Sequence, residues 1–193
     1  GYSREYGIYI LGDLAVKDGV TKPLNDEDFF DFGKLNIKTL NKSVSLNVNA
    51  DLKELNPVWE KNLYTAFKEN GLISLAFWFG SLYAEQIRGL DKTYPFLELI
   101  GEPGSGKSTL IEFMWRLCGR PDEEGFDPVK STAAARARRL SQVANLPVVL
   151  IEGDRGDEKD MKQKSFDWDE LKTAYNGRSP RSRGVKNAGN ETY

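Results

Sequence analysis

The fold of this chain is decided by one segment near its middle, Gly101-Glu102-Pro103-Gly104-Ser105-Gly106-Lys107-Ser108-Thr109. Its first eight residues match the P-loop pattern G-x-x-x-x-G-K-[ST] at every fixed position. The run FLELI at residues 96–100 predicts a short β-strand before it, and apolar residues at helical spacing predict a helix after it, ended by Gly119. We therefore predict an α/β fold with a P-loop NTPase core built on a parallel sheet.

The residue types of this P-loop suit the phosphates of a nucleotide. Glycines let backbone N–H groups converge on phosphate oxygens without obstruction by Cβ atoms, and the following helix adds its positive dipole end. We expect residues 101–109 to bind ATP, with Lys107 as a catalytic residue on the β- and γ-phosphates, Ser108 as a Mg²⁺ ligand and Thr109 near the α-phosphate. The alternative is an ordinary glycine-rich turn.

A second element of the site is predicted after the apolar run VVLI at residues 148–151, which is typical of a buried strand. Glu152 and Asp154 follow it, and an acid that closes an apolar strand is the Walker B pattern. In an α/β sheet this end of the strand lies beside the P-loop. We predict that Glu152 binds Mg²⁺ or its water shell and that Asp154 polarises water, two roles that could be exchanged. A solvated acidic turn is the alternative.

Two segments are predicted before the P-loop core. Residues 1–50 carry alternating apolar residues between glycine-containing turns, which indicates a small β-rich segment. Residues 51–93 carry apolar residues at near-helical spacing, with an expected break at Asn70-Gly71. Residues 94–193 would form the P-loop core, with further helices at 132–143 and 168–175. We expect that core to be incomplete at its C-terminal end.

Composition excludes several classes of site. The chain has no histidine and one cysteine, so a His-ligated metal, a His-based triad and an internal disulfide are excluded. A formal net charge of −2 means that a nucleic-acid site would have to be local. The longest apolar stretch, residues 72–83, is too short to cross a bilayer, so no membrane partner is expected. The single thiol fits a reducing, cytoplasmic compartment.

Three segments carry a resemblance to a known family. The P-loop, the run STAAA at residues 131–135 and the run LPVVLIEGD at residues 146–154 together resemble the ATPase module of phage and plasmid primase–helicases, which are superfamily 3-like and AAA+-related. The resemblance covers residues 94–193 and is looser before them. It implies a motor that couples ATP hydrolysis to translocation on single-stranded DNA, a hexameric ring in the full-length protein, and the cytoplasm of a bacterial host or phage-infected cell.

The same family carries basic residues on a loop or hairpin that faces the channel of the ring. The matching region here, residues 171–186, holds four candidate DNA-binding cations: Arg178, Arg181, Arg183 and Lys186. Such a positive strip suits phosphate contacts, and without an interleaved aromatic residue it predicts sequence-independent binding. The alternatives are a basic surface loop, or an arginine that acts on the nucleotide of a neighbouring subunit.

Other interpretations stay open. A second basic cluster, Lys130, Arg136, Arg138 and Arg139, is interpreted as a solvated helix face or subunit contact rather than a DNA site. The family's next strand ends in a polar sensor residue, and no such strand precedes Tyr193, so binding is better supported than turnover. The alternative functions are an AAA+-like ATPase that acts on a protein partner, a nucleotide-binding module without turnover, and, less favoured, a small-molecule kinase.

Overall fold

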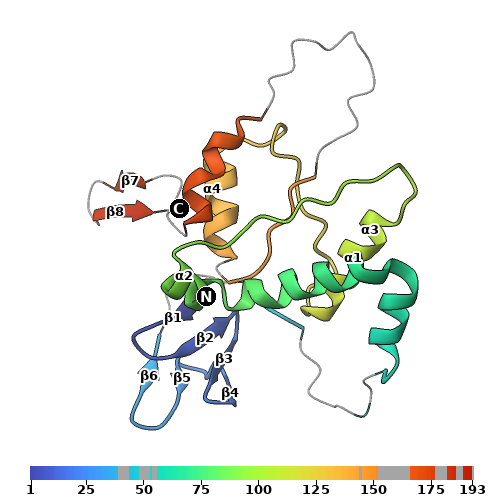
Figure 1. The fold of residues 1–193 in the computed structure, drawn as a ribbon. Coiled ribbons are helices and arrows are strands. Elements are labelled where there is room, and N and C mark those ends of the chain that lie inside the picture. The colour runs from blue at the N-terminus through green and yellow to red at the C-terminus, as the bar shows by residue number, and fades with distance from the viewer. Residues whose placement is uncertain are drawn as a thin grey trace.

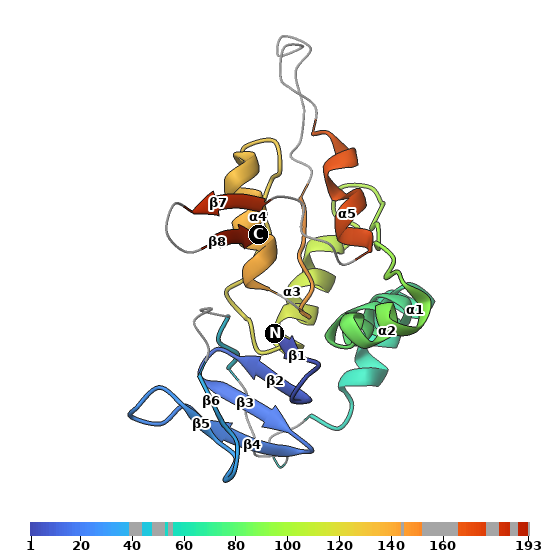
Figure 2. The same cartoon turned by 90° about the vertical axis from the view of Figure 1, so that its left-hand side faces the viewer.

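A computed structural model describes residues 1–38, 44–47, 53, 56–143, 145–151, 166–176, 182–185 and 189–192, the last two segments as backbone. Strands β1 to β6 lie together at one end of the molecule, and α4 lies toward the other end (Figures 1 and 2). The elements in chain order are β1 (Tyr2–Ser3), β2 (Ile8–Leu11), β3 (Leu14–Lys17), β4 (Val20–Pro23), β5 (Phe30–Asp31), β6 (Asn36–Ile37), α1 (Trp59–Leu82), α2 (Ala84–Asp91), α3 (Lys107–Leu117), α4 (Ala133–Gln142), the 3₁₀ helix η3 (Trp168–Leu171), α5 (Lys172–Tyr175), β7 (Ser182–Val185) and β8 (Gly189–Thr192).

The N-terminal strands form an antiparallel meander in the order β1-β2-β3-β4, and β5 pairs with β6. The turn between β3 and β4 is Asp18-Gly19, and both residues have positive φ values of 50° and 76°, as a tight type I′ hairpin turn requires. Alternation buries Ile8 and Ala15, which pack with Phe30 into a small core. The β-rich character predicted for this region is therefore present in the structure.

The sheet meets the helices at α2 (Figure 2). Arg4 Nε lies 2.9 Å from Glu85 Oε1, and Arg4 Nη2 donates to the Glu85 carbonyl at 2.7 Å. The ring of Tyr9 contacts that of Tyr83 edge-on, with 6.4 Å between their centroids. These contacts are polar or partly exposed, so they join the sheet to the helices without a continuous apolar core.

Helix α1 is long and kinked. Its one non-helical residue is Lys68, with φ 53° and ψ −140°. The sequence predicted the break at Asn70-Gly71, and the kink lies before that pair. Gly71 instead allows close packing, because a Cβ there would lie 2.8 Å from Phe67 Cβ.

Helices α1 and α3 lie next to each other (Figure 1), and an apolar core forms between them. Its buried members are Leu63 and Trp78 from α1 and Leu110, Met114 and Trp115 from α3. The rings of Trp78 and Trp115 meet edge-on at 5.1 Å between centroids. This core holds α3, and thereby the residues of the P-loop that precede it.

The predicted helices after the P-loop are present: α3 ends before Gly119, and Thr132 caps α4 by accepting a hydrogen bond from Ala135 N at 3.2 Å. Residues 96–100 form no strand in the described structure, and the one parallel pairing among described residues joins Phe126 and Leu150. The parallel sheet of the predicted α/β core therefore stays a prediction. No helix among the described residues is long and apolar enough to cross a membrane.

Candidate functional site

The P-loop, residues 101–109, leads directly into α3, which begins at Lys107. Its first five residues are exposed to solvent, and so are Ser108 and Thr109. Gly104 and Gly106 have positive φ values of 78° and 86°, a backbone region that glycine enters without strain. The loop is thus an accessible turn whose shape depends on its glycines.

Close packing gives Gly106 a second requirement. A Cβ at this position would lie 3.2 Å from Phe67 Cε1, so the absence of a Cβ lets the start of α3 pack this closely against α1. A Cβ on Gly101 would lie 2.9 Å from Ser105 Oγ within the loop itself. Glycine at these two positions therefore permits contacts that hold the loop compact.

The start of α3 offers backbone donors to solvent. The first N–H groups of any helix have no partner within it, and here the first helical hydrogen bond runs from Leu110 N to Gly106 O at 2.9 Å. Gly106 is the N-cap and has no side chain to accept from those groups. Exposed amides at the positive end of a helix dipole are the feature that binds phosphate oxygens.

The side chain of Lys107 bends back over the loop. Its Nζ donates to the carbonyl oxygens of Gly101 and Glu102, the second at 2.8 Å, and to Ser105 Oγ at 3.3 Å. An ammonium has three donors, and these acceptors match them in number. A phosphate held by the loop would compete for the same donors, since charged oxygens are stronger acceptors than neutral carbonyls. The hydrogen bonds to the loop hold Lys107 Nζ where a phosphate bound by the loop would lie within its reach.

The residues present fit magnesium in part. Ser108 lies exposed in the first turn of α3, and Mg²⁺ in nucleotide sites takes few protein ligands because phosphate oxygens and water complete its shell. Within the described part of the chain, no three Asp, Glu, Cys or His side chains gather closely enough to hold a metal ion by themselves. The Ser108 hydroxyl therefore suits a metal bridged to a nucleotide, rather than one held by protein alone.

The predicted Walker B strand is described only as far as Ile151; Glu152 and Asp154 lie outside the described residues. Phe126 N donates to Val149 O at 3.1 Å, and Ile151 N donates to Phe126 O at 3.0 Å. These two bonds form a parallel bridge, which is the pairing that an α/β core would use here. The roles of both acids stay predictions.

Of the four cations in the predicted DNA-binding strip, the structure describes only Arg183. Arg178, Arg181 and Lys186 lie outside the described residues, and Arg183 is described as backbone, paired with Glu191 between the antiparallel strands β7 and β8. A hairpin is one of the two forms that the resemblance implies for this region. Contacts of its cations with DNA stay a prediction.

The second basic cluster has internal partners. Arg136 Nη1 donates to the Pro128 carbonyl at 2.9 Å, and its guanidinium lies 5.0 Å from the ring centroid of Phe166. Lys130 Nζ lies 3.8 Å from Asp127 Oδ2. The Arg136–Pro128 contact holds α4 onto the loop before it, while the Lys130–Asp127 pair lies within that loop.

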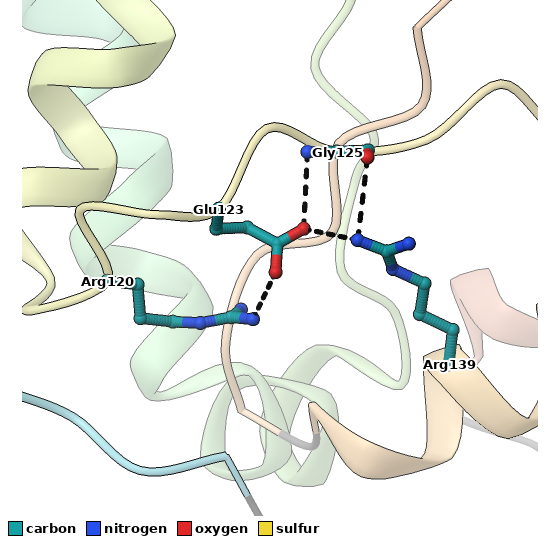
Figure 3. A network of polar contacts seen from close by, with 4 residues as sticks. All are labelled: Arg120, Glu123, Gly125 and Arg139. Atoms are coloured by element: carbon teal, nitrogen blue, oxygen red, sulfur yellow. Dashed lines mark hydrogen bonds and ion pairs between the residues drawn. The ribbon is translucent and has the colours of Figure 1, made fainter.

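A network around Glu123 was not predicted from the sequence (Figure 3). Glu123 Oε1 accepts from Arg139 Nη2 at 2.6 Å and from Gly125 N at 3.2 Å, while its Oε2 pairs with Arg120. Burial lowers the pKa of Arg120, and the adjacent Glu123 carboxylate opposes that effect. The spacing of three residues between Arg120 and Glu123 is a weak sequence signal; the approach of Arg139 depends on the tertiary fold.

Comparisons of this chain with family models, with curated proteins and with solved structures give no match.

Proposed function

We propose that this chain binds ATP with Mg²⁺ through residues 101–109, as the ATPase module of a DNA helicase similar to those of phage and plasmid primase–helicases. One observation carries the nucleotide site: an exposed glycine-rich loop leads into an uncapped helix start, with Lys107 Nζ bent over the loop. Loop amides, a helix dipole and a lysine at one point are complementary to a chain of phosphates.

The chain's own residues account for binding. No side chain caps the amides at the start of α3, so their N–H groups can donate to phosphate oxygens. Lys107 would exchange its carbonyl partners for the β- and γ-phosphates, and Ser108 would supply the hydroxyl for Mg²⁺. When bound, Mg²⁺ neutralises the charge that develops on the phosphates.

The motor function rests on the resemblance and on residues predicted from the sequence. Glu152 would bind Mg²⁺ or its water shell and Asp154 would polarise the attacking water, in either assignment. Arg178, Arg181, Arg183 and Lys186 would contact the backbone of single-stranded DNA, in a ring formed by the full-length protein.

Nucleotide binding is tested by titrating a fluorescent ATP analogue in the presence of Mg²⁺. Lys107→Ala should weaken binding at least tenfold, because it removes charge-assisted hydrogen bonds to phosphate. Lys61→Ala, an exposed lysine on α1, is the matched control and should bind as the parent does. Equal affinities for the two variants would contradict the P-loop assignment.

The helicase proposal is tested by ATP turnover with and without single-stranded DNA at low salt. DNA should stimulate turnover, and the double variant Arg181→Glu, Arg183→Glu should lose DNA binding while it keeps nucleotide affinity. The double variant Lys34→Glu, Lys61→Glu makes the same charge change at exposed positions and should behave as the parent. ATP binding without any response to DNA would overturn the helicase proposal and favour a protein partner. Binding without turnover would favour a nucleotide-binding module.

A further inference from the structure

The side chain of Phe67, on α1, lies against Gly106 of the P-loop. A Cβ at Gly106 would lie 3.2 Å from Phe67 Cε1 and 3.7 Å from its Cζ. Among the described residues, apart from the chain neighbours of Gly106, no other one comes within 4 Å of that position. The far end of the Phe67 ring is therefore what α1 presents to the residue at which the loop turns into α3.

Gly106 determines where the backbone donors of the loop point. Its φ of 86° and ψ of 10° lie in the left-handed region, and its carbonyl accepts the first hydrogen bond of α3, from Leu110 N at 2.9 Å. A glycine can leave this region at little cost, because it has no Cβ. A packing contact on Gly106 limits that freedom and keeps the N–H groups at the start of α3 aimed at one point.

The ring of Phe67 is itself held in place. It is half-buried and packs against the apolar core between α1 and α3. Gly71 lies one turn further along α1, and a Cβ there would lie 2.8 Å from Phe67 Cβ and 3.4 Å from Leu63 Cδ1. Glycines at positions 71 and 106 thus leave the space that the Phe67 side chain occupies. A side chain packed on both sides in this way can support the backbone beside it.

Backbone strain next to Phe67 is an independent observation. Lys68 is the one residue of α1 with non-helical angles, φ 53° and ψ −140°. Such a conformation is unfavourable for a residue with a Cβ, persists only where the surrounding structure fixes it, and is found most often at ligand sites. The kink of α1 therefore falls directly after the residue whose ring contacts the P-loop.

We propose that Phe67 is a positioning residue of the nucleotide site. Its ring holds Gly106 in the left-handed conformation, so that the amides of the loop are arranged before a phosphate arrives. Phe67 has no polar side-chain atom, so it acts on phosphate only through the backbone of Gly106. This role rests on the proposed nucleotide binding of residues 101–109, and it adds to that site a residue outside the P-loop pattern.

The first test replaces Phe67 by leucine and by methionine. Phe67→Leu lacks the ε and ζ carbons that approach Gly106, whereas Phe67→Met still reaches as far as an ε carbon. In titrations of a fluorescent ATP analogue with Mg²⁺, Phe67→Leu should bind about fivefold more weakly, because the loop is less preorganised. Phe67→Met should restore most of the parent's affinity.

Phe77→Leu is the matched control. It makes the same change at another half-buried position of α1 that packs on the same core. Urea denaturation followed by tryptophan fluorescence should show a similar loss of stability in the two leucine variants, while only Phe67→Leu loses nucleotide affinity. Equal losses of affinity in Phe67→Leu and Phe77→Leu would reduce Phe67 to a core residue and overturn the proposal.

Inorganic triphosphate, used as a competitor of the fluorescent analogue, separates positioning from direct contact with the base. Phe67→Leu should weaken triphosphate and ATP by the same factor, since both use the loop amides. A loss confined to ATP would mean that the ring contacts the base, which would overturn the positioning role.

The parent chain and Lys107→Ala keep the two proposals distinguishable. If the parent binds ATP, Lys107→Ala binds it more weakly and Phe67→Leu binds it as the parent does, the nucleotide site stands and the role of Phe67 is overturned alone. No binding of ATP by the parent would overturn both.

Discussion

At the scale of single residues, Glu123 is held by two arginines and a backbone N–H group. The side chains of Arg120 and Glu123 are 9% and 16% exposed, and that of Arg139 is 43% exposed. Glu123→Gln would leave the nearly buried Arg120 without its counter-charge, while the more exposed Arg139 can turn to solvent. We expect the free energy of unfolding to fall by about 2–3 kcal/mol. Urea denaturation followed by tryptophan fluorescence measures it.

The neighbouring Glu124 provides the control for this prediction. It is exposed, so Glu124→Gln removes the same charge one position away without breaking a described contact of the network. We expect its unfolding midpoint to match that of the parent. Similar midpoints for Glu123→Gln and Glu124→Gln would mean that the ion pairs contribute nothing net to stability.

Cys118, at the end of α3, should be an unreactive thiol. Burial raises its pKa to about 11, and Trp78 and Arg120 oppose that shift only in part. The thiolate is the nucleophile, so at pH 8 iodoacetamide should alkylate the folded chain much more slowly than the chain in urea. Mass spectrometry can follow the reaction, since the chain has one cysteine. Equal rates in the two states would contradict the burial of this thiol.

The same pKa shift predicts how stability depends on pH. The ordinary pKa is 9.0 and the folded value is higher, so the folded state holds the thiol proton more tightly. The contribution of Cys118 is complete below pH 9 and is lost as pH rises toward 11. Cys118→Ser should therefore remove part of the alkaline decline in unfolding free energy. A decline of the same size in Cys118→Ser would exclude the thiol as its source.

At the scale of elements, helices were predictable from the sequence where their signals are local. Thr132 caps α4, and Gly119 follows α3 with a φ of 71°; both are short-range features of the chain. The kink of α1 was misplaced because Gly71 looked like a helix breaker. In the fold, Gly71 is buried against Leu63 and Phe67, and that contact cannot be seen in a one-dimensional pattern.

In the candidate site too, local sequence signals predict one part, and the other part depends on contacts made by the tertiary fold. The glycine-rich turn that leads into α3 could be predicted because its residue types at fixed spacing specify a local backbone path, while its role as a nucleotide-binding P-loop stays a prediction. The Arg120–Glu123–Arg139 network could not, since Arg139 reaches Glu123 from another helix. Strand pairing for residues 96–100 likewise depends on partners distant in sequence, which periodicity does not specify.

Lys68 gives a test of strain within α1. Its φ of 53° with ψ of −140° lies where residues with a Cβ are strained. Lys68→Gly should relieve more strain than glycine costs in chain entropy, raising the free energy of unfolding by about 1 kcal/mol. Lys61→Gly, in the regular part of the same helix, should lower it by about 1 kcal/mol. A loss of stability in both variants would show that the helix is straight at Lys68 in solution.

At the scale of the whole molecule, the described residues form two separate apolar cores. One, in the sheet, is built on Ile8, Ala15 and Phe30, and the other lies between α1 and α3. The joint between them includes the pair of Arg4 with Glu85, whose side chains are 58% and 37% exposed. Ion pairs this exposed contribute about 1 kcal/mol or less, so the two cores should be only weakly coupled.

Weak coupling predicts that each core can be damaged alone. Phe30 is fully buried in the sheet, and Phe30→Ala should destabilise it by about 3 kcal/mol, which would speed amide hydrogen exchange in β2 and β3. The four tryptophans, Trp59, Trp78, Trp115 and Trp168, all lie outside the sheet, so the fluorescence midpoint and the nucleotide affinity should change little. Met114→Ala, fully buried in the other core, should do the reverse: it should lower the fluorescence midpoint and leave exchange in β2 and β3 slow. If either variant shifted both measurements equally, the chain would unfold as one cooperative unit, and the polar joint at α2 would couple the cores more strongly than its exposure implies.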